Sequence, residues 1–277
     1  MKKSATKKLK EHFRLATAAM RTLPHFIIVG AQKAGTTSLY WYLLQHPQVL
    51  GVAKKEIHFF DTEFHRGIRW YRANFPTTME IQIRDATKGI RHLSGEASPY
   101  YMFHPHAPRR MAEVLPDARL IVLLRDPVER AYSHYNHVVK RGGEPLPFEE
   151  AVKKEQERLD GELEKMIADE TYRSPNYRRF SYVSRGYYVD QLKELGKFFP
   201  RKQIMVIKSE DLFQRTQETY DQVLEFLELK PWTLKSTASK NKGSYSPGPL
   251  PLEKELRAHF QPYNKQLNEY LGVDFGW

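Results

Sequence analysis

The stretch from Phe26 to Leu39 constrains the fold of this chain more than any other. It begins with the apolar residues FIIV, which predict a buried strand. Gly30 and Gly35 follow and allow a tight loop that a ligand can approach closely. From Thr36 onward, leucines at helical spacing predict a helix. A strand, a glycine-containing loop and a helix start form an anion-binding site, because backbone N–H groups and the positive end of the helix point to one place.

The position of the lysine separates this loop from the common ATP- and GTP-binding loop. A Walker A sequence places lysine directly after the second glycine, whereas Lys33 precedes Gly35 by two residues. We therefore expect neither an ordinary ATPase nor an ordinary GTPase. Thr36, Thr37 and Ser38 add hydroxyl donors. A plain strand–turn–helix with a surface lysine is the alternative, and the coincidence of so many anion-binding groups disfavours it.

Composition limits the class of protein. The chain has 277 residues, a formal net charge of +11 and no cysteine. The charge favours anionic partners, such as phosphorylated ligands, acidic polysaccharide, nucleic acid or an anionic membrane surface. The lack of cysteine excludes disulfides and thiolate metal sites. No apolar run approaches the roughly 18 residues of a membrane-spanning helix, and no secretory signal is evident, so we expect a cytoplasmic location and no transmembrane segment.

Alternating strands and helices predict an α/β fold: a single domain with a central parallel sheet flanked by helices. Residues 1–22 are basic and predict an amino-terminal helix or extension, either docked on the body or frayed, or a surface-seeking amphipathic helix. The main domain is expected to span residues 23–277 and to carry a helical and loop insertion at about 142–182. In that insertion, residues 147–169 predict one charged helix, and residues 172–182 interleave arginines with aromatics. That last segment is an acceptor lid, a nucleic-acid stacking surface or a loop that packs its rings on the body.

Arg125 stands at the end of the second stretch that clearly predicts a strand. It follows five aliphatic residues that predict a buried parallel strand. Asp126 can cap the next helix and Pro127 suits its first position, and that helix should run to about Lys140. Arg125 and Ser133 therefore lie near the carboxyl end of a strand, where open α/β sheets bind ligands. A salt bridge to a neighbouring carboxylate is the alternative role for Arg125.

Two further segments contain clustered polar groups. Residues 54–61 hold Lys55, Glu56, His58 and Asp61, a high density of ionisable side chains for so short a stretch. Alone they would be expected as solvent-exposed charges, but an anion site nearby makes them functional candidates. Residues 95–101 are predicted as a turn-rich stretch with an aromatic pair.

Six short motifs occur in the order seen in sulfotransferases, which use 3′-phosphoadenosine 5′-phosphosulfate (PAPS). They are residues 30–38, 55–61, 95–99, 125–127 with Ser133, 185–188 and 242–245. Through them, and over nearly the whole chain from residue 24, the sequence resembles the glycosaminoglycan-type branch, which includes heparan sulfate enzymes and their bacterial relatives. The resemblance implies a P-loop-like phosphosulfate-binding loop, PAPS as co-substrate and 3′-phosphoadenosine 5′-phosphate (PAP) as product. No carboxylate cluster has metal-ligand spacing, so we expect no metal.

The resemblance also implies roles for individual residues. The 5′-phosphosulfate would be held by Lys33, Ala34, Gly35, Thr36, Thr37 and Ser38, the 3′-phosphate by Arg125 and Ser133, and other parts of the nucleotide by Tyr187 and the closing loop of Lys242, Gly243, Ser244 and Tyr245. Glu56 falls where this branch carries its catalytic base, and Asp61 where it has a second acidic residue. His58 remains a competing base, because its intrinsic pKa range suits neutral pH. Ala97 replaces a lysine of the heparan-type motif, which argues against a heparan-like acceptor.

The expected function is transfer of a sulfuryl group from PAPS to a hydroxyl or amine of a carbohydrate or small natural product. Two alternatives stay open: a nucleotide-dependent kinase with a variant phosphate loop, and a basic RNA- or polysaccharide-binding module without turnover. The expected partner is a small-molecule or saccharide acceptor rather than nucleic acid. The acceptor's identity and the oligomeric state do not follow from the sequence.

Overall fold

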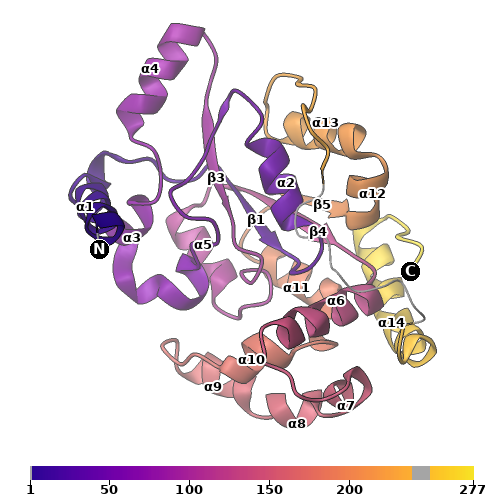
Figure 1. Cartoon of the computed structure of the whole chain (residues 1–277). Helices are drawn as coiled ribbons and strands as arrows, with labels where there is room; N and C mark the ends of the chain where they lie inside the picture. The colour runs from indigo at the N-terminus through magenta and orange to yellow at the C-terminus, as the bar shows by residue number, and fades with distance from the viewer. Residues whose placement is uncertain (1, 239–249) are drawn as a thin grey trace.

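The structure, a computed structural model, describes residues 2–238 and 250–277. Its five described strands form one parallel sheet in the order β2-β3-β1-β4-β5 (Figure 1). The strands are β1 (Phe26–Gly30), β2 (Val49–Leu50), β3 (Leu93–Ala97), β4 (Arg119–Leu124) and β5 (Ile204–Lys208). The predicted α/β fold with a central parallel sheet is therefore confirmed.

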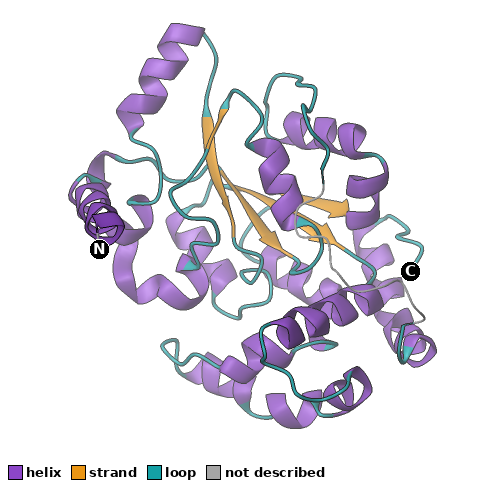
Figure 2. Ribbon diagram, viewed as in Figure 1, coloured by secondary structure: helices purple, strands orange, loops and turns teal. Residues whose placement is uncertain are grey.

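Helices cover both faces of this sheet, as Figure 2 shows. In chain order they are α1 (Lys2–Ala16), α2 (Thr36–Leu43), α3 (Gly67–Arg72), α4 (Thr78–Lys88), α5 (Ala107–Val114), α6 (Pro127–Lys140), α7 (Phe148–Lys153), α8 (Glu155–Leu159), α9 (Glu162–Ala168), α10 (Pro175–Phe180), α11 (Tyr188–Gly196), α12 (Ser209–Gln214), α13 (Thr216–Phe226) and α14 (Glu253–Leu271). Short helical turns are η1 (Ala18–Met20), η2 (Phe59–Glu63), η3 (Phe64–Arg66), η4 (Ser184–Gly186) and η5 (Arg201–Gln203). In Figure 1, α2, α12 and α13 lie on one side of the sheet, and α5 and α11 on the other. Among the described residues, no helix combines the length and apolar character needed to cross a membrane.

The strand order creates a switch point between β1 and β4. The chain leaves β1 toward β2 on one side of the sheet, whereas it leaves β4 toward β5 on the other. Loops that diverge in this way open a crevice outside the carboxyl ends of the two strands, where α/β folds bind ligands. The same geometry brings the loop after β1 next to the start of α6.

The core explains why these segments form strands. Every residue of β1 is fully buried or nearly so, as are Leu120 to Leu124 of β4, which fits a central position covered on both faces. A second hydrophobic cluster joins α6, α7 and α14 through Val128, Phe148 and Phe260. This second cluster supports the insertion of α7–α10, which lies below α6 in Figure 1.

The start of α6 follows the prediction closely. The side chain of Asp126 accepts hydrogen bonds from the backbone N–H groups of Val128 and Glu129, at 2.8 and 3.2 Å. Pro127 occupies the first helical position. The cap and the proline end β4 and begin α6 within two residues, so Arg125 remains at the carboxyl edge of the sheet.

The prediction of a turn-rich stretch at residues 95–101 is wrong for its first part. Residues 93–97 form the central strand β3, and only the residues after Ala97 turn. The sequence hides this strand because Ser94, Gly95 and Glu96 are not apolar. Gly95 is required by packing, because a Cβ there would lie 2.4 Å from the ring of Phe26 on β1.

The charged helix predicted over residues 147–169 is three helices, α7, α8 and α9. The last break falls at Gly161, which has a left-handed backbone with φ of 66°. At the amino terminus, α1 docks through polar contacts: Arg14 donates to the carbonyls of Ala73 and Phe75 at 2.6 and 3.0 Å. The apolar face predicted for this helix does not make that contact, since Leu9 and other apolar residues of the face stay exposed.

Candidate active site

The loop after β1 has the geometry of an anion site. Gly35 is the N-cap of α2, with φ of 95°. Because glycine has no side chain, the first turn of the helix carries no side-chain cap. A Cβ at Gly35 would lie 2.9 Å from the ring of Phe213 on α12, which leaves no room for a larger residue. Thr36 and Thr37 line the adjoining cavity. Ala34 and Ser38 are fully buried behind them.

The cavity has a volume of about 1660 Å³ and lies outside the carboxyl ends of the strands. It is large enough for a nucleotide together with part of an acceptor. Its wall includes Lys33, Arg125, Ser133, Glu56, His58 and the arginines at 141, 173, 178, 179 and 185. The cavity therefore joins the predicted nucleotide residues and the predicted catalytic segment in one space.

Lys33 lies at the cationic side of the cavity. Its backbone is left-handed, with φ of 74°. Burial lowers the pKa of its ammonium group, and the positive charges of Arg125 and Arg141 lower it further. The clustering of like charges is unfavourable in the empty protein and becomes favourable when an anionic ligand enters.

Arg125 and Ser133 face the same cavity from β4 and α6. Arg125 donates to Glu129 at 2.7 Å, as the salt-bridge alternative predicted, and its Nη1 also lies 3.4 Å from the carbonyl oxygen of Lys33. The hydroxyl of Tyr188 donates to the carbonyl of Arg125 at 2.8 Å and holds the strand end in place. Arg125 thus bridges the loop after β1 and the first turn of α6.

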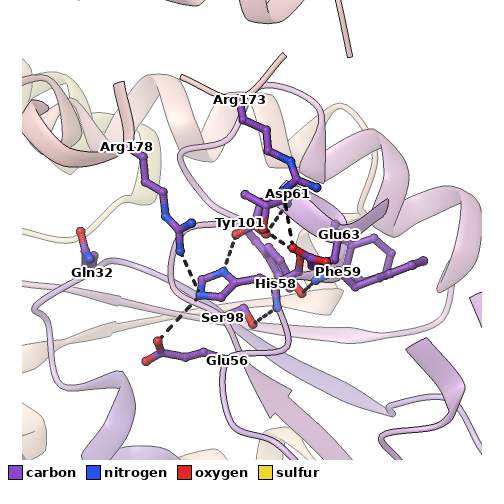
Figure 3. A network of polar contacts seen from close by, with 12 residues as sticks. Gln32, Glu56, His58, Phe59, Asp61, Glu63, Ser98, Tyr101, Arg173 and Arg178 are labelled. Carbon is purple, nitrogen blue, oxygen red and sulfur yellow. Dashed lines mark hydrogen bonds and ion pairs between the residues drawn. The ribbon is translucent and has the colours of Figure 1, made fainter. Parts of the chain in front are cut away.

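The catalytic candidates of residues 56–61 surround His58 (Figure 3). The buried carboxylate of Asp61 accepts a hydrogen bond from His58 Nδ1 at 2.7 Å. Burial opposes ionisation of Asp61, but the hydrogen bonds from His58 and from the Thr62 N–H hold the pKa of Asp61 below its usual value. Because an ionised carboxylate only accepts, His58 carries hydrogen on Nδ1.

The other ring nitrogen of His58 faces two charged groups. Arg178 Nη2 donates to His58 Nε2 at 3.2 Å, and the Glu56 carboxylate lies 3.8 Å from the same nitrogen. Lys55 connects Glu56 to the phosphate loop, since its Nζ is 3.2 Å from Glu56 Oε1 and 2.6 Å from the Thr37 hydroxyl. The side chain of Glu56 is 43% exposed, so it can reach a ligand in the cavity.

The segment of residues 172–182 borders the cavity and also packs on the body of the protein. Its arginines 173, 178 and 179 line the cavity, as expected for an acceptor lid. Its ring residues pack inward: Tyr177 stacks on Phe103 with ring centroids 4.6 Å apart, and Tyr182 is fully buried. The insertion thus places positive charge over the catalytic candidates.

Some predicted residues lie elsewhere. Tyr187 points toward α14, where its hydroxyl is 2.8 Å from His259 Nε2 and its ring packs on Tyr263, and it is not part of the cavity wall. Lys242, Gly243, Ser244 and Tyr245 lie outside the described residues. Within the described part of the chain, no three His, Cys, Asp or Glu side chains converge as metal ligands would.

Sequence reasoning missed two buried charged residues, one in the cavity wall and one behind it. Arg185 is part of the wall, lies 4.9 Å from the ring centroids of Tyr100 and Phe103, and donates to Gln32. Glu96 is fully buried in β3. Both residues belong to motifs of the sequence, Arg185 to residues 185–188 and Glu96 to residues 95–99, but no local pattern shows that Glu96 is buried.

The switch-point cavity, the glycine-containing loop and the cations that follow β1 and β4 define an α/β protein with a cationic cavity at the carboxyl edge of its sheet. The family model for the sulfotransferase domain matches residues 23–243. This chain therefore belongs to the sulfotransferase family.

Individual relatives agree with this assignment. The chain is 31% identical to a crystallised sulfotransferase from Alicyclobacillus acidocaldarius, with a TM-score of 0.68 over 92% of this chain and 98% of that one. It is 26% identical to membrane-associated sulfotransferase kil1 of Dictyostelium discoideum, over 92% of this chain and 66% of that protein. It is 29% identical to heparan sulfate glucosamine 3-O-sulfotransferase 3A1 of Mus musculus, over 93% of this chain and 65% of that protein. The chain thus spans about two thirds of the length of these last two relatives. The kinase and binding-module alternatives gain no support from them.

Proposed function

We propose that this chain transfers a sulfuryl group from PAPS to a hydroxyl or amine of a carbohydrate or small-molecule acceptor. The observation that carries the proposal is that Lys33 in the loop after β1, Arg125 after the neighbouring strand β4, and Ser133 on α6 line one cavity. PAPS has anionic groups at its 5′ and 3′ positions, and these two groups of residues match that arrangement. The membership of the sulfotransferase family supports the same donor.

The nucleotide residues divide between two anion-binding points. Residues 33–38, with the uncapped start of α2, suit the 5′-phosphosulfate. Arg125 and Ser133 suit the 3′-phosphate, because a guanidinium and a hydroxyl both donate to phosphate oxygens. Tyr187, which is not part of the cavity wall, and residues 242–245, which lie outside the described residues, remain predicted nucleotide residues.

Glu56 and Lys33 would act on two different oxygens of the transfer: Glu56 at the acceptor hydroxyl and Lys33 at the bridging oxygen of the donor. Glu56 takes the proton of the acceptor hydroxyl while the new S–O bond forms. Lys33 stabilises the negative charge that develops on the bridging oxygen of the donor as the old S–O bond breaks. No change of oxidation state occurs, and the proton is the only other species that moves.

The choice of Glu56 over His58 rests on their contacts. Both ring nitrogens of His58 already have partners, Asp61 and Arg178, whereas Glu56 is more exposed to the cavity. We therefore assign the base to Glu56, with Asp61 and His58 orienting the acceptor. His58 becomes the base in the alternative in which Arg178 moves away.

The acceptor side of the cavity favours a negatively charged substrate. Arg173, Arg178 and Arg179 line it and supply donors suited to carboxylates or sulfates. An acidic saccharide fits this surface, and relatives include enzymes named for heparan sulfate glucosamine. The buried Ala97 takes the place of a lysine at the end of β3, which supports an acceptor that differs from heparan sulfate. A cytoplasmic location stays a prediction.

A transfer screen tests the proposal. Radiolabelled PAPS is incubated with the chain and with acidic oligosaccharides, neutral oligosaccharides or simple phenols, with and without EDTA. We expect labelled product from at least one acceptor class and no loss with EDTA. Phosphate transfer from ATP that requires Mg²⁺, without sulfate transfer, would establish the kinase alternative instead. Arg125→Ala is the matched control, because it should weaken the binding of PAP.

A further inference from the structure

Glu96 is a fully buried carboxylate for which the proposed mechanism has no use. It accepts hydrogen bonds from three hydroxyl groups: Tyr71 at 2.6 Å, Ser98 at 2.8 Å and Tyr101 at 3.2 Å. A buried carboxylate with this many dedicated donors is a costly feature for a protein to maintain. It therefore needs an explanation beyond packing.

Two of these hydroxyls also contact the catalytic segment. The Ser98 hydroxyl accepts a hydrogen bond from the backbone N–H of His58 at 3.3 Å, and the Tyr101 hydroxyl accepts one from the N–H of Phe59 at 2.8 Å (Figure 3). Glu96 is thus linked through two side chains to two successive amides. Its third donor, Tyr71, comes from α3 and donates to the same carboxylate oxygen as Tyr101.

The direction of these hydrogen bonds depends on Glu96. Ser98 and Tyr101 both donate to Glu96, and where the carboxylate is ionised it can only accept, so both hydroxyls must then point their hydrogens at it. Their oxygen lone pairs are then free to accept from the amides of His58 and Phe59. A residue that donates in place of Glu96 would turn at least one of these hydroxyls around or leave it without a partner.

The segment needs such support because its backbone is unusual. Glu56 and His58 both have left-handed backbones, with φ of 54° and 59°. Neither is glycine, and residues other than glycine adopt this conformation only where the surroundings impose it. The two amides held by Ser98 and Tyr101 are those of His58 itself and of the residue that follows it.

We propose that Glu96 is a positioning residue that, through Ser98 and Tyr101, holds the backbone of residues 58–59 in the geometry that presents Glu56 and His58 to the acceptor. The inference rests on the proposed sulfuryl transfer and adds to it a residue outside the cavity wall. Glu96 touches neither donor nor acceptor. Its effect is on the placement of the residues that do.

Glu96→Gln is the first test, because it keeps the size of the side chain but replaces one acceptor oxygen by a donor. Glu144→Gln is the matched control: Glu144 is also buried and accepts from the Tyr182 hydroxyl at 2.9 Å, but it lies in the insertion, away from residues 56–61. With the best acceptor from the transfer screen, we expect Glu96→Gln to lower kcat by about ten- to a hundredfold. The KM for PAPS and the binding of PAP should change by less than about twofold in the same variant. An equal loss of kcat in both variants would overturn the proposal.

A double-mutant cycle tests the route through Ser98. Ser98→Ala alone should lower kcat, but it should add little in the Glu96→Gln background, because the same link is already broken. Additive losses would overturn the proposal. Tyr101→Phe removes only a hydroxyl and provides a well-folded second variant if Glu96→Gln does not fold.

Amide hydrogen exchange provides a readout without turnover. The amides of His58 and Phe59 should exchange faster in Glu96→Gln or Tyr101→Phe than in the wild type, and at the wild-type rate in Glu144→Gln. Unchanged exchange in the first two variants would refute the link. If the wild type transfers no sulfate at all, the proposed function fails, while the exchange experiment still decides whether Glu96 positions this segment.

Discussion

The phosphate loop of residues 30–38 and the catalytic segment of residues 56–61 border the same cavity, but they are held in place differently. The loop follows β1, which is paired on both sides, and backbone bonds anchor its start: the Ala31 N–H donates to Leu123 of β4 at 2.7 Å, and the Ala34 N–H donates to Ala31 at 3.2 Å. The side chains of Lys55 and Arg125 add contacts to Thr37 and to the Lys33 carbonyl. The segment depends instead on the side chains of Ser98 and Tyr101.

This difference separates two kinds of functional loop. A loop built from backbone bonds next to a central strand keeps its shape through many side-chain changes. A segment held by buried hydroxyls around a carboxylate depends on each of these partners, because a buried polar group without one is costly. We therefore expect mutations in the loop to act on the ligand directly, and mutations behind the segment to act through geometry.

The largest effect is expected at Glu56. Glu56→Gln keeps the size and a hydrogen bond but removes the base, so turnover should fall by roughly 10²–10⁴, while PAP binding stays near that of the wild type. Initial rates and calorimetry with PAP measure the two quantities. His58→Ala should cost less. An inactive His58→Ala with a nearly active Glu56→Gln would reverse the two roles.

Lys33 tests the loop in the same assay. Lys33→Ala should lower turnover by about two to three orders of magnitude, because it removes one electrostatic donor to a developing anion. The comparison of kcat with the dissociation constant of PAPS is decisive. If Lys33→Ala turned over normally and only bound PAPS more weakly, Lys33 would contribute to the binding of PAPS but not to stabilising the transition state.

The support behind the segment should appear in the pH dependence of stability. Burial raises the pKa of Glu96 from 4.5 to about 7, and the nearby Asp61 adds to the rise, against the hydrogen bonds from Tyr71, Ser98 and Tyr101. Tyr40 on α2 is the other titratable group that interacts with it. Because the folded pKa lies above the unfolded one, the stabilisation is complete below about pH 4.5 and is lost as the pH rises through about 7.

The loss should reach about 3 kcal/mol by pH 8. Urea unfolding of the wild type and of Glu96→Gln at pH 5 and pH 8 measures it. From pH 5 to pH 8, the free energy of unfolding of Glu96→Gln should rise relative to that of the wild type. A pH-independent difference would mean that Glu96 titrates at the same pH in the folded and unfolded chains.

The smallest effect is expected at Arg125, where the loop meets α6. Arg125→Ala should weaken PAP binding by about ten- to a hundredfold, the range for a lost charge-assisted hydrogen bond. Adenosine 5′-phosphosulfate, which lacks the 3′-phosphate, is the matched ligand and should bind both proteins alike. If the wild type bound that ligand as tightly as PAPS, the assignment of Arg125 and Ser133 to the 3′-phosphate would be wrong.

Local sequence predicted the loop side of the site well. The apolar runs at 26–29 and 120–124 lie in strands β1 and β4, and Asp126 caps α6 as expected. These features rest on interactions between near neighbours: apolar runs, a cap and glycines that permit a turn. Such interactions leave a signal within a few residues of sequence.

Tertiary structure alone decided the catalytic side. Strand β3 is polar in sequence, and it is buried because Tyr71 and Tyr101, 25 and 5 residues away, satisfy Glu96. Arg178 meets His58 across 120 residues, and that contact, which no local pattern encodes, occupies the ring nitrogen that Asp61 does not contact. The sequence by itself determined which residues are present at the carboxyl edge of the sheet. Only the packing of distant side chains decided how they face one another, because the energy of a buried polar group depends on partners that the chain brings together when it folds.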